Sequence, residues 1–270
     1  MKRSSFIEKT IAITEELQST FFKKFFVYDA LPSTNATAKE LAQKGEPEGT
    51  VIISRTQTQG RGRFDRTWQS PDGGLYVSVI LRPTVPLQRI TLLPLIASLS
   101  VATAIDSYGL KTSIKWPNDV RVHQRKIAGI LLESEGTSTN LEYGILGIGI
   151  NVNISQDDFP SDMRCFATSL SNECKKSIDM YSFQKSLFYS INKYYTEFLQ
   201  DKDVQLMNKW KQKTDTLGKT VEIHTSKEII IGKACDVDSS GFLIVQTKPN
   251  QFRKIMSGDC KYLKELIHTH

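Results

Sequence analysis

Cysteine and histidine are scarce in this sequence, and their spacing argues against several kinds of site. The 270 residues include four cysteines and four histidines. The cysteines form no C-x-x-C pair, so we expect no structural zinc site and interpret all four as reduced thiols. No Ser/His/Asp or Cys/His arrangement is recognisable, so catalysis through a side-chain nucleophile is not expected.

Long apolar runs and internal repeats are also missing. No stretch approaches the roughly 18 uncharged apolar residues of a membrane-spanning helix. The basic start, Met1-Lys2-Arg3, lacks the apolar segment of a secretory signal, because Glu8, Glu15 and Glu16 interrupt it. No repeat of about 20–50 residues is visible. We therefore expect a cytoplasmic protein that does not enter a membrane.

The charge balance is moderately basic. Lysine and arginine total 35 against 29 acidic residues, which gives a net charge of +6. Such a protein can bind nucleic acid, phosphates or acidic partners. The basic residues are spread along the chain, which disfavours nucleic acid. The length and the hydrophobic fraction of 39% suit one large globular domain plus a small one.

Strand and helix signals alternate through the first 213 residues. Residues 92–108 are apolar on nearly every face, which indicates a buried helix. Helices are also expected within 1–24, after Asn35 to about Lys44, at 182–199 and at 204–213, and strands at 25–29, 50–56, 75–81, 112–115, 126–135 and 141–150.

The pattern changes after Thr216-Leu217-Gly218, where only short strand signals follow. These strands are expected at 219–223, 229–236, 242–247 and 252–256, with a turn at 238–241. Several short strands in so short a segment predict a small antiparallel barrel. We expect a helical extension at 1–24, a main domain at 25–215 and the barrel at 216–270.

The segment from Gln57 to Trp68, QTQGRGRFDRTW, is the most informative motif. Its two glycines let the backbone approach a ligand closely. Its three arginines can surround a phosphate or a carboxylate, and Trp68 offers a flat face for a nucleobase. A flexible basic surface loop is the alternative, which the location between two predicted strands disfavours.

Two further motifs carry polar residues beside predicted strands. In Lys115-Trp116-Pro117-Asn118-Asp119, Asp119 could hold Mg²⁺ and Asn118 could bind a nucleotide, although both are also ordinary turn residues. Lys126 begins an apolar strand and could point into a pocket, although an exposed lysine at a strand end is the more common case.

Two more motifs indicate close approach or capping. Gly147 and Gly149 lie inside a predicted strand before Asn151, where glycine marks either a ligand or tight packing. Ser33-Thr34-Asn35 is suited to begin a helix as its N-cap, and its polar groups could also contact a ligand.

The order and spacing of these five motifs resemble the catalytic domain of the biotin protein ligases. The resemblance covers about residues 25–170, including Ala167-Thr168-Ser169-Leu170, and the tail is similar to the family's SH3-like domain. It implies an α+β catalytic domain with a mixed sheet of the biotin/lipoate ligase type, followed by a small SH3-like β-barrel. It also implies activation of biotin with ATP to biotinyl-5′-AMP, and transfer to a lysine of a biotin carboxyl carrier protein.

The resemblance also implies roles for individual residues. Arg63 and Lys126 would be catalytic, and Asp119 would hold Mg²⁺. The residues implied for biotin are Ser33, Thr34, Asn35, Gln57, Arg61, Gly62, Arg63, Lys126, Gly147 and Gly149. The residues implied for ATP are Arg61, Arg63, Arg66, Trp68, Lys115, Asn118, Asp119 and Asn151.

Three other functions were weighed. A lipoate–protein ligase would share the fold but is expected to carry a different glycine-rich motif. A nucleic-acid-binding module is disfavoured by the scattered charge, and the roughly 30 residues before Ser33 are too few for a winged helix-turn-helix domain. A biotin sensor without catalysis is disfavoured by Lys126 and Asp119. A homodimer is compatible with the sequence.

Overall fold

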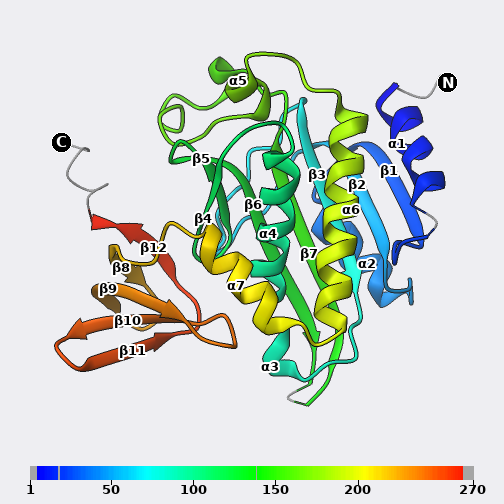
Figure 1. The fold of residues 1–270 in the computed structure, drawn as a ribbon. Coiled ribbons are helices and arrows are strands. Elements are labelled where there is room, and N and C mark those ends of the chain that lie inside the picture. Colours follow the sequence, from blue (N-terminus) through cyan, green and yellow to red (C-terminus); the bar gives the residue numbers. More distant parts are fainter. Residues whose placement is uncertain (1–4, 18, 138, 264–270) are drawn as a thin grey trace.

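A seven-stranded mixed sheet forms the centre of the protein (Figure 1). The computed structural model describes residues 5–17, 19–137 and 139–263. The strands lie in the order β1-β2-β3-β7-β6-β5-β4; β1 and β2 are parallel, and all other neighbours are antiparallel. Their bounds are β1 Lys24–Leu31, β2 Thr50–Gln57, β3 Gly74–Leu81, β4 Thr112–Lys115, β5 Asp119–Val122, β6 Arg125–Gly136 and β7 Leu141–Asn151.

Helices cover both faces of this sheet, which explains the continuous apolar runs of its central strands. Every residue of β3 is buried. On one face, α2 (Thr34–Gln43) packs Ala38 and Ala42 against Ile52 and Ile80. On the other face lie α4 (Leu93–Asp106) and α6 (Met180–Leu199), which run side by side across the sheet (Figure 1). The remaining helical segments are α1 Ser5–Glu16, α3 Leu87–Ile90, η1 Gln156–Asp158, α5 Leu170–Cys174 and α7 Asp203–Lys213.

The α3–α4 segment is the core helix that the sequence predicts. Among the described residues, Leu87–Asp106 is the one helical stretch long and apolar enough to cross a membrane. However, 72% of its most apolar window is buried inside the protein. The apolar composition is therefore explained by packing between the sheet and α6.

A second sheet of five antiparallel strands follows α7 and lies beside β4 and α7 (Figure 1). Its order is β11-β10-β9-β8-β12, with bounds β8 Thr220–His224, β9 Ile229–Val237, β10 Leu243–Lys248, β11 Gln251–Ile255 and β12 Asp259–Tyr262. The two sheets are joined by buried polar contacts. Trp116 Nε1 donates to the Gly241 carbonyl at 3.1 Å, and the hydroxyls of Thr216 and Tyr262 lie 2.9 Å apart.

The expected mixed-sheet fold and small SH3-like unit are both confirmed, and two strands were missed. The Asn118-Asp119 pair indicated only a turn, but the turn covers residues 116–118 and β5 begins at Asp119. The strand β12 has only four residues, and its alternation of polar and buried side chains is too short to mark it in the sequence. Both strands form because neighbouring strands supply hydrogen bonds, which overrides weak local signals. The expected helix within 1–24 is α1, and residues 1–4 and 18 lie outside the described part.

Candidate active site

The predicted site residues gather around one cavity of about 260 Å³. The cavity lies against β6 and β7, beneath the loop between β2 and β3, with Gly258, Asp259 and Cys260 of the small sheet on one side. Except for Asn151, every residue named above for biotin or ATP lines it. Asn151 lines an adjoining cavity of about 200 Å³, which shares Trp68, Lys115, Asp119 and Lys126 with the first.

Glycines make the floor of the cavity flat. Gly149 lies directly opposite Gly129 in the β6–β7 register. A Cβ atom at Gly149 would lie 2.5 Å from Trp68 Nε1, and one at Gly147 would lie 2.2 Å from Asn35 Oδ1. The sequence marked these glycines as places of close approach, and in this structure two side chains of the site make that approach. No larger residue fits there without displacing them.

A corner of hydroxyl and amide groups closes one end of the cavity. Gln57 Oε1 accepts from the backbone N–H of Thr34 at 2.8 Å and from the Thr34 hydroxyl at 3.1 Å. The Ser78 hydroxyl lies 2.6 Å from Asn35 Oδ1 and 2.8 Å from Thr34 Oγ1. Ser33 accepts from Ala36 N as the N-cap of α2, so the predicted cap is confirmed. This corner offers fixed donors and acceptors to a neutral polar ligand.

Cations of the site form ion pairs with acids of the protein. They lie in β6 and in the loop between β2 and β3, here called the Gly-Arg loop (residues 58–73). Arg61 pairs with Glu133 at 3.0 Å and Arg66 with Asp259 at 2.5 Å. The Lys126 ammonium lies 2.5 Å from Asp119 Oδ1. The hydrogen bond from Arg66 lowers the pKa of Asp259 against the opposing effect of burial, so this carboxylate is charged at neutral pH. Each of these cations therefore contacts a carboxylate of the protein itself.

Arg63 connects the Gly-Arg loop to two other parts of the chain. Its guanidinium donates to Asn118 Oδ1 at 3.3 Å and to the Ser257 hydroxyl at 2.9 Å. Burial lowers its pKa, although an arginine remains charged at neutral pH. The loop is therefore fastened both to the turn before β5 and to the small sheet.

Trp68 lies over the glycine floor rather than outside the cavity. Lys126 Nζ is 5.1 Å from the centre of its ring, within the range of a cation–π contact. Its indole N–H is buried, and no described residue accepts a hydrogen bond from it. Trp68 borders both cavities, the one that contains the polar corner and the adjoining one that contains Asn151.

Sequence reasoning missed the residues that support this site. Ser78 interrupts the apolar strand β3 and is fully buried, which is a detectable signal because a buried polar side chain needs a partner. Glu133 follows the apolar run of β6 and gives no such signal. Gly129 lies three positions after Lys126 in the same predicted strand, where a glycine can mark the close approach of another group. Ser257 and Asp259 carry no local signal, since only the packing of the small sheet brings them to the loop.

The chain matches known proteins in both of its parts. Residues 27–151 match the biotin/lipoate A/B protein ligase family, and residues 216–261 match the biotin protein ligase C terminal domain. The bifunctional ligase/repressor BirA of Bacillus subtilis is 36% identical over 234 residues, which cover 86% of this chain and 72% of that protein. The biotin–[acetyl-CoA-carboxylase] ligase of Mycobacterium tuberculosis is 31% identical over 219 residues, covering 78% and 79%.

A solved structure agrees with this result. The biotin protein ligase from Aquifex aeolicus, in complex with biotin and ATP, superposes with a TM-score of 0.76 at 29% identity. The match covers 89% of this chain and 98% of that one. The chain described here therefore belongs to the biotin protein ligase family.

Proposed function

We propose that this chain activates biotin with ATP and transfers the biotinyl group to a lysine of a biotin carboxyl carrier protein. The observation that carries the proposal is the cavity itself. Its lining combines three cations, Arg61, Arg63 and Lys126, with the polar corner and with Lys115 and Asn118. A reaction between two anions needs such a cluster of cations.

The chemistry explains why cations, and not a side-chain nucleophile, fill the site. The biotin carboxylate attacks the α-phosphorus of ATP, a new carboxyl–phosphorus linkage forms, and pyrophosphate leaves. Both reactants are negative, so arginine and lysine must offset their repulsion and stabilise the charge of the transition state. In the second step, a carrier lysine amine attacks the acyl carbon of biotinyl-5′-AMP and AMP leaves.

The two substrates are assigned to opposite sides of Trp68. The ureido ring of biotin carries N–H donors and a carbonyl acceptor, which suit Ser33, Thr34, Asn35 and Gln57. The floor glycines Gly147 and Gly149, together with Gly62 of the loop, give its rings access to the backbone. We assign to the nucleotide Arg66, Trp68, Lys115, Asn118, Asp119 and Asn151, and to both substrates Arg61, Arg63 and Lys126, all of which line the two cavities.

Binding of these substrates requires an exchange of partners. Arg61 is held by Glu133, and Lys126 by Asp119, both at 3.0 Å or less. A substrate carboxylate or phosphate would replace these acids as the partner of each cation. The pairs at Arg61 and Arg66 are solvent-exposed, and such pairs contribute only about 0–1 kcal/mol, so the exchange costs little.

Asp119 fits Mg²⁺ only as one of several ligands. The described residues contain no group of three or more Asp, Glu, His or Cys side chains that could hold a metal ion. Mg²⁺ commonly binds one or two carboxylates together with substrate phosphates, so the ion would arrive with ATP and offset phosphate charge. Lys126 would then exchange Asp119 for a substrate oxygen.

We further propose residues 1–24, 25–215 and 216–270 as helical extension, catalytic domain and small β-barrel domain. The family matches at 27–151 and 216–261 support the last two. A reaction that consumes ATP also supports a cytoplasmic location.

ATP–pyrophosphate exchange tests the proposed function. With Mg²⁺ present, exchange should require biotin and should be absent with lipoate or without an acid. Exchange stimulated by lipoate but not by biotin would overturn the assignment in favour of a lipoate ligase.

A further inference from the structure

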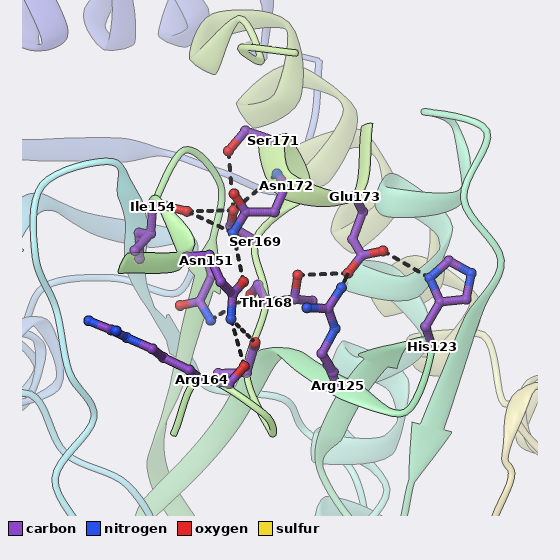
Figure 2. A network of polar contacts seen from close by, with 12 residues as sticks. His123, Arg125, Asn151, Ile154, Arg164, Thr168, Ser169, Ser171, Asn172 and Glu173 are labelled. Carbon is purple, nitrogen blue, oxygen red and sulfur yellow. Dashed lines mark hydrogen bonds and ion pairs between the residues drawn. The ribbon is translucent and has the colours of Figure 1, made fainter. Parts of the chain in front are cut away.

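A buried carboxylate outside the cavity collects three hydrogen bonds at the start of β6 (Figure 2). Glu173 of α5 accepts from Arg125 Nη2 at 2.6 Å, from the Thr168 hydroxyl at 2.7 Å and from His123 Nδ1 at 2.9 Å. Its side chain is only 4% exposed. Three donors from two parts of the sequence, residues 123–125 and Thr168, thus converge on one acid that has no role in the proposed reaction.

Thr168 connects this carboxylate to two residues assigned to the substrates. Its backbone N–H donates to the Lys126 carbonyl at 2.9 Å. Its own carbonyl accepts from Asn151 Nδ2 at 3.0 Å (Figure 2). The Lys126 N–H donates in turn to the Phe166 carbonyl at 2.7 Å. Residues 166–168 therefore form a short parallel pairing with Lys126 and fix Asn151 at the same time.

The helix that carries Glu173 is itself fastened to the chain after β7. Ser169 caps α5, and its hydroxyl donates to the Ile154 carbonyl at 2.6 Å. The Asn172 amide donates to the same carbonyl at 3.2 Å. These two bonds anchor α5 at Ile154, and Glu173 in turn connects Arg125 to Thr168.

The protonation state of Glu173 suits this role. Burial raises the pKa of its carboxyl. Hydrogen bonds from Thr168 and His123 and the charge of Arg125 lower the pKa by more than burial raises it, so the pKa lies below its ordinary value. The side chain is thus an acceptor for every donor around it at neutral pH. Loss of its charge would leave a buried arginine contact and a buried hydroxyl without a full partner.

We infer that Glu173 is a positioning residue for the adenylation step. It fixes the position of Lys126 through Arg125, and it fixes the positions of both Lys126 and Asn151 through Thr168. The inference rests on the proposed function, which assigns Lys126 to the carboxylate end of biotin and Asn151 to ATP. Lys126 lies next to Arg125 in β6, so a shift of the strand start moves the ammonium directly. Displacements of about 1 Å at such a group cost roughly 100-fold in rate.

The test is the single-turnover rate of biotinyl-adenylate formation at saturating substrates, measured for Glu173→Gln, Thr168→Val and the double variant. Glu173→Gln keeps the shape but presents an N–H₂ group to one of the three donors. We expect each single variant to lower the rate about 10-fold or more and to raise the KM for ATP more than that for biotin. The double variant should be no slower than the slower of the two single variants, because both changes break the same hydrogen bond between Thr168 and Glu173.

Asp106→Asn is the matched control. Asp106 also accepts from a backbone N–H and a hydroxyl, both of Thr112, and pairs with Lys213, but it lies away from both cavities. It should lower the melting temperature without changing the adenylation rate. A wild-type rate for folded Glu173→Gln would overturn the inference; if that variant does not fold, a wild-type rate for Thr168→Val overturns it equally.

Lys126→Ala, measured in the same assay, separates this inference from the proposed function. A wild-type rate for Lys126→Ala would remove the role assigned to Lys126. A slow Lys126→Ala beside a wild-type Glu173→Gln would refute only the positioning role of Glu173.

Discussion

At the scale of single residues, the site consists of cations that already have partners. Lys126 contacts Asp119 on one side and the face of Trp68 on the other. Its ammonium is therefore held over the glycine floor before any substrate arrives. A group held in this way needs little reorganisation when charge develops at the α-phosphate.

Replacing Lys126 by alanine tests that arrangement. The loss of one charge-assisted contact costs about 1.5–3 kcal/mol, which corresponds to roughly a 10- to 150-fold effect. We expect Lys126→Ala to weaken biotin binding and to slow adenylation, because the lysine is assigned to both substrates. Calorimetric titration with biotin and the exchange assay measure the two effects. Unchanged values for a folded variant would contradict the assignment.

At the scale of elements, the Gly-Arg loop connects the sheet, the turn before β5 and the small sheet. Its arginines reach Glu133 of β6, Asn118 of the turn and Ser257 and Asp259 at the start of β12. Biotinyl-5′-AMP is a reactive mixed anhydride, so a loop with these fastenings is suited to retain it.

Removing Arg63 should weaken retention of the adenylate more than its synthesis, since Arg61 and Lys126 still face the attacking carboxylate. The variant Arg63→Ala should then release biotinyl-5′-AMP and label exposed lysines of an unrelated protein. Streptavidin blotting of a bystander protein measures this labelling. Equal and negligible labelling by variant and wild type, with adenylate synthesis intact in both, would show that Arg63 does not retain the intermediate.

Some of these elements could be predicted from the sequence and others could not. The strands β2 and β3 and the helix α4 carry strong apolar patterns and lie where those patterns indicated. The site motifs were visible because they combine glycine, arginine and short turns. The acids that hold the arginines were not visible, because Glu133 meets the loop only when the large sheet forms and Asp259 only when the small sheet packs beside it. Glu173 is separated from Lys126 by 47 positions, and its role depends on the placement of α5.

At the scale of the whole molecule, the two sheets meet at Tyr262 of β12. This side chain is 3% exposed, its hydroxyl lies 2.6 Å from Asp215 Oδ1, and Lys219 Nζ lies 3.8 Å from the ring centre. Burial and the charge of Asp215 raise the pKa of Tyr262 far above its ordinary value. The interface thus depends on a neutral tyrosine.

This arrangement predicts a loss of stability in alkaline solution. A tyrosine in the unfolded chain loses its proton at about pH 10, whereas Tyr262 in the folded protein keeps its proton because its pKa is raised. Above that pH the unfolded state binds fewer protons, so the free energy of unfolding falls by about 1.4 kcal/mol per pH unit for this group. The variant Tyr262→Phe should be less stable at neutral pH but should lose stability less steeply above about pH 10. Urea unfolding at several pH values compares the slopes, and equal slopes would contradict the interpretation.

The central claim for the whole molecule is that one chain both activates biotin and transfers it. The most direct measurement is intact-mass spectrometry of a biotin carboxyl carrier domain incubated with the protein, biotin, ATP and Mg²⁺. The account predicts addition of a single biotinyl group that depends on ATP and disappears when the acceptor lysine of the carrier is replaced by arginine. A carrier that stays unmodified beside active, folded protein, or that gains a lipoyl group when lipoate is supplied in place of biotin, would contradict it.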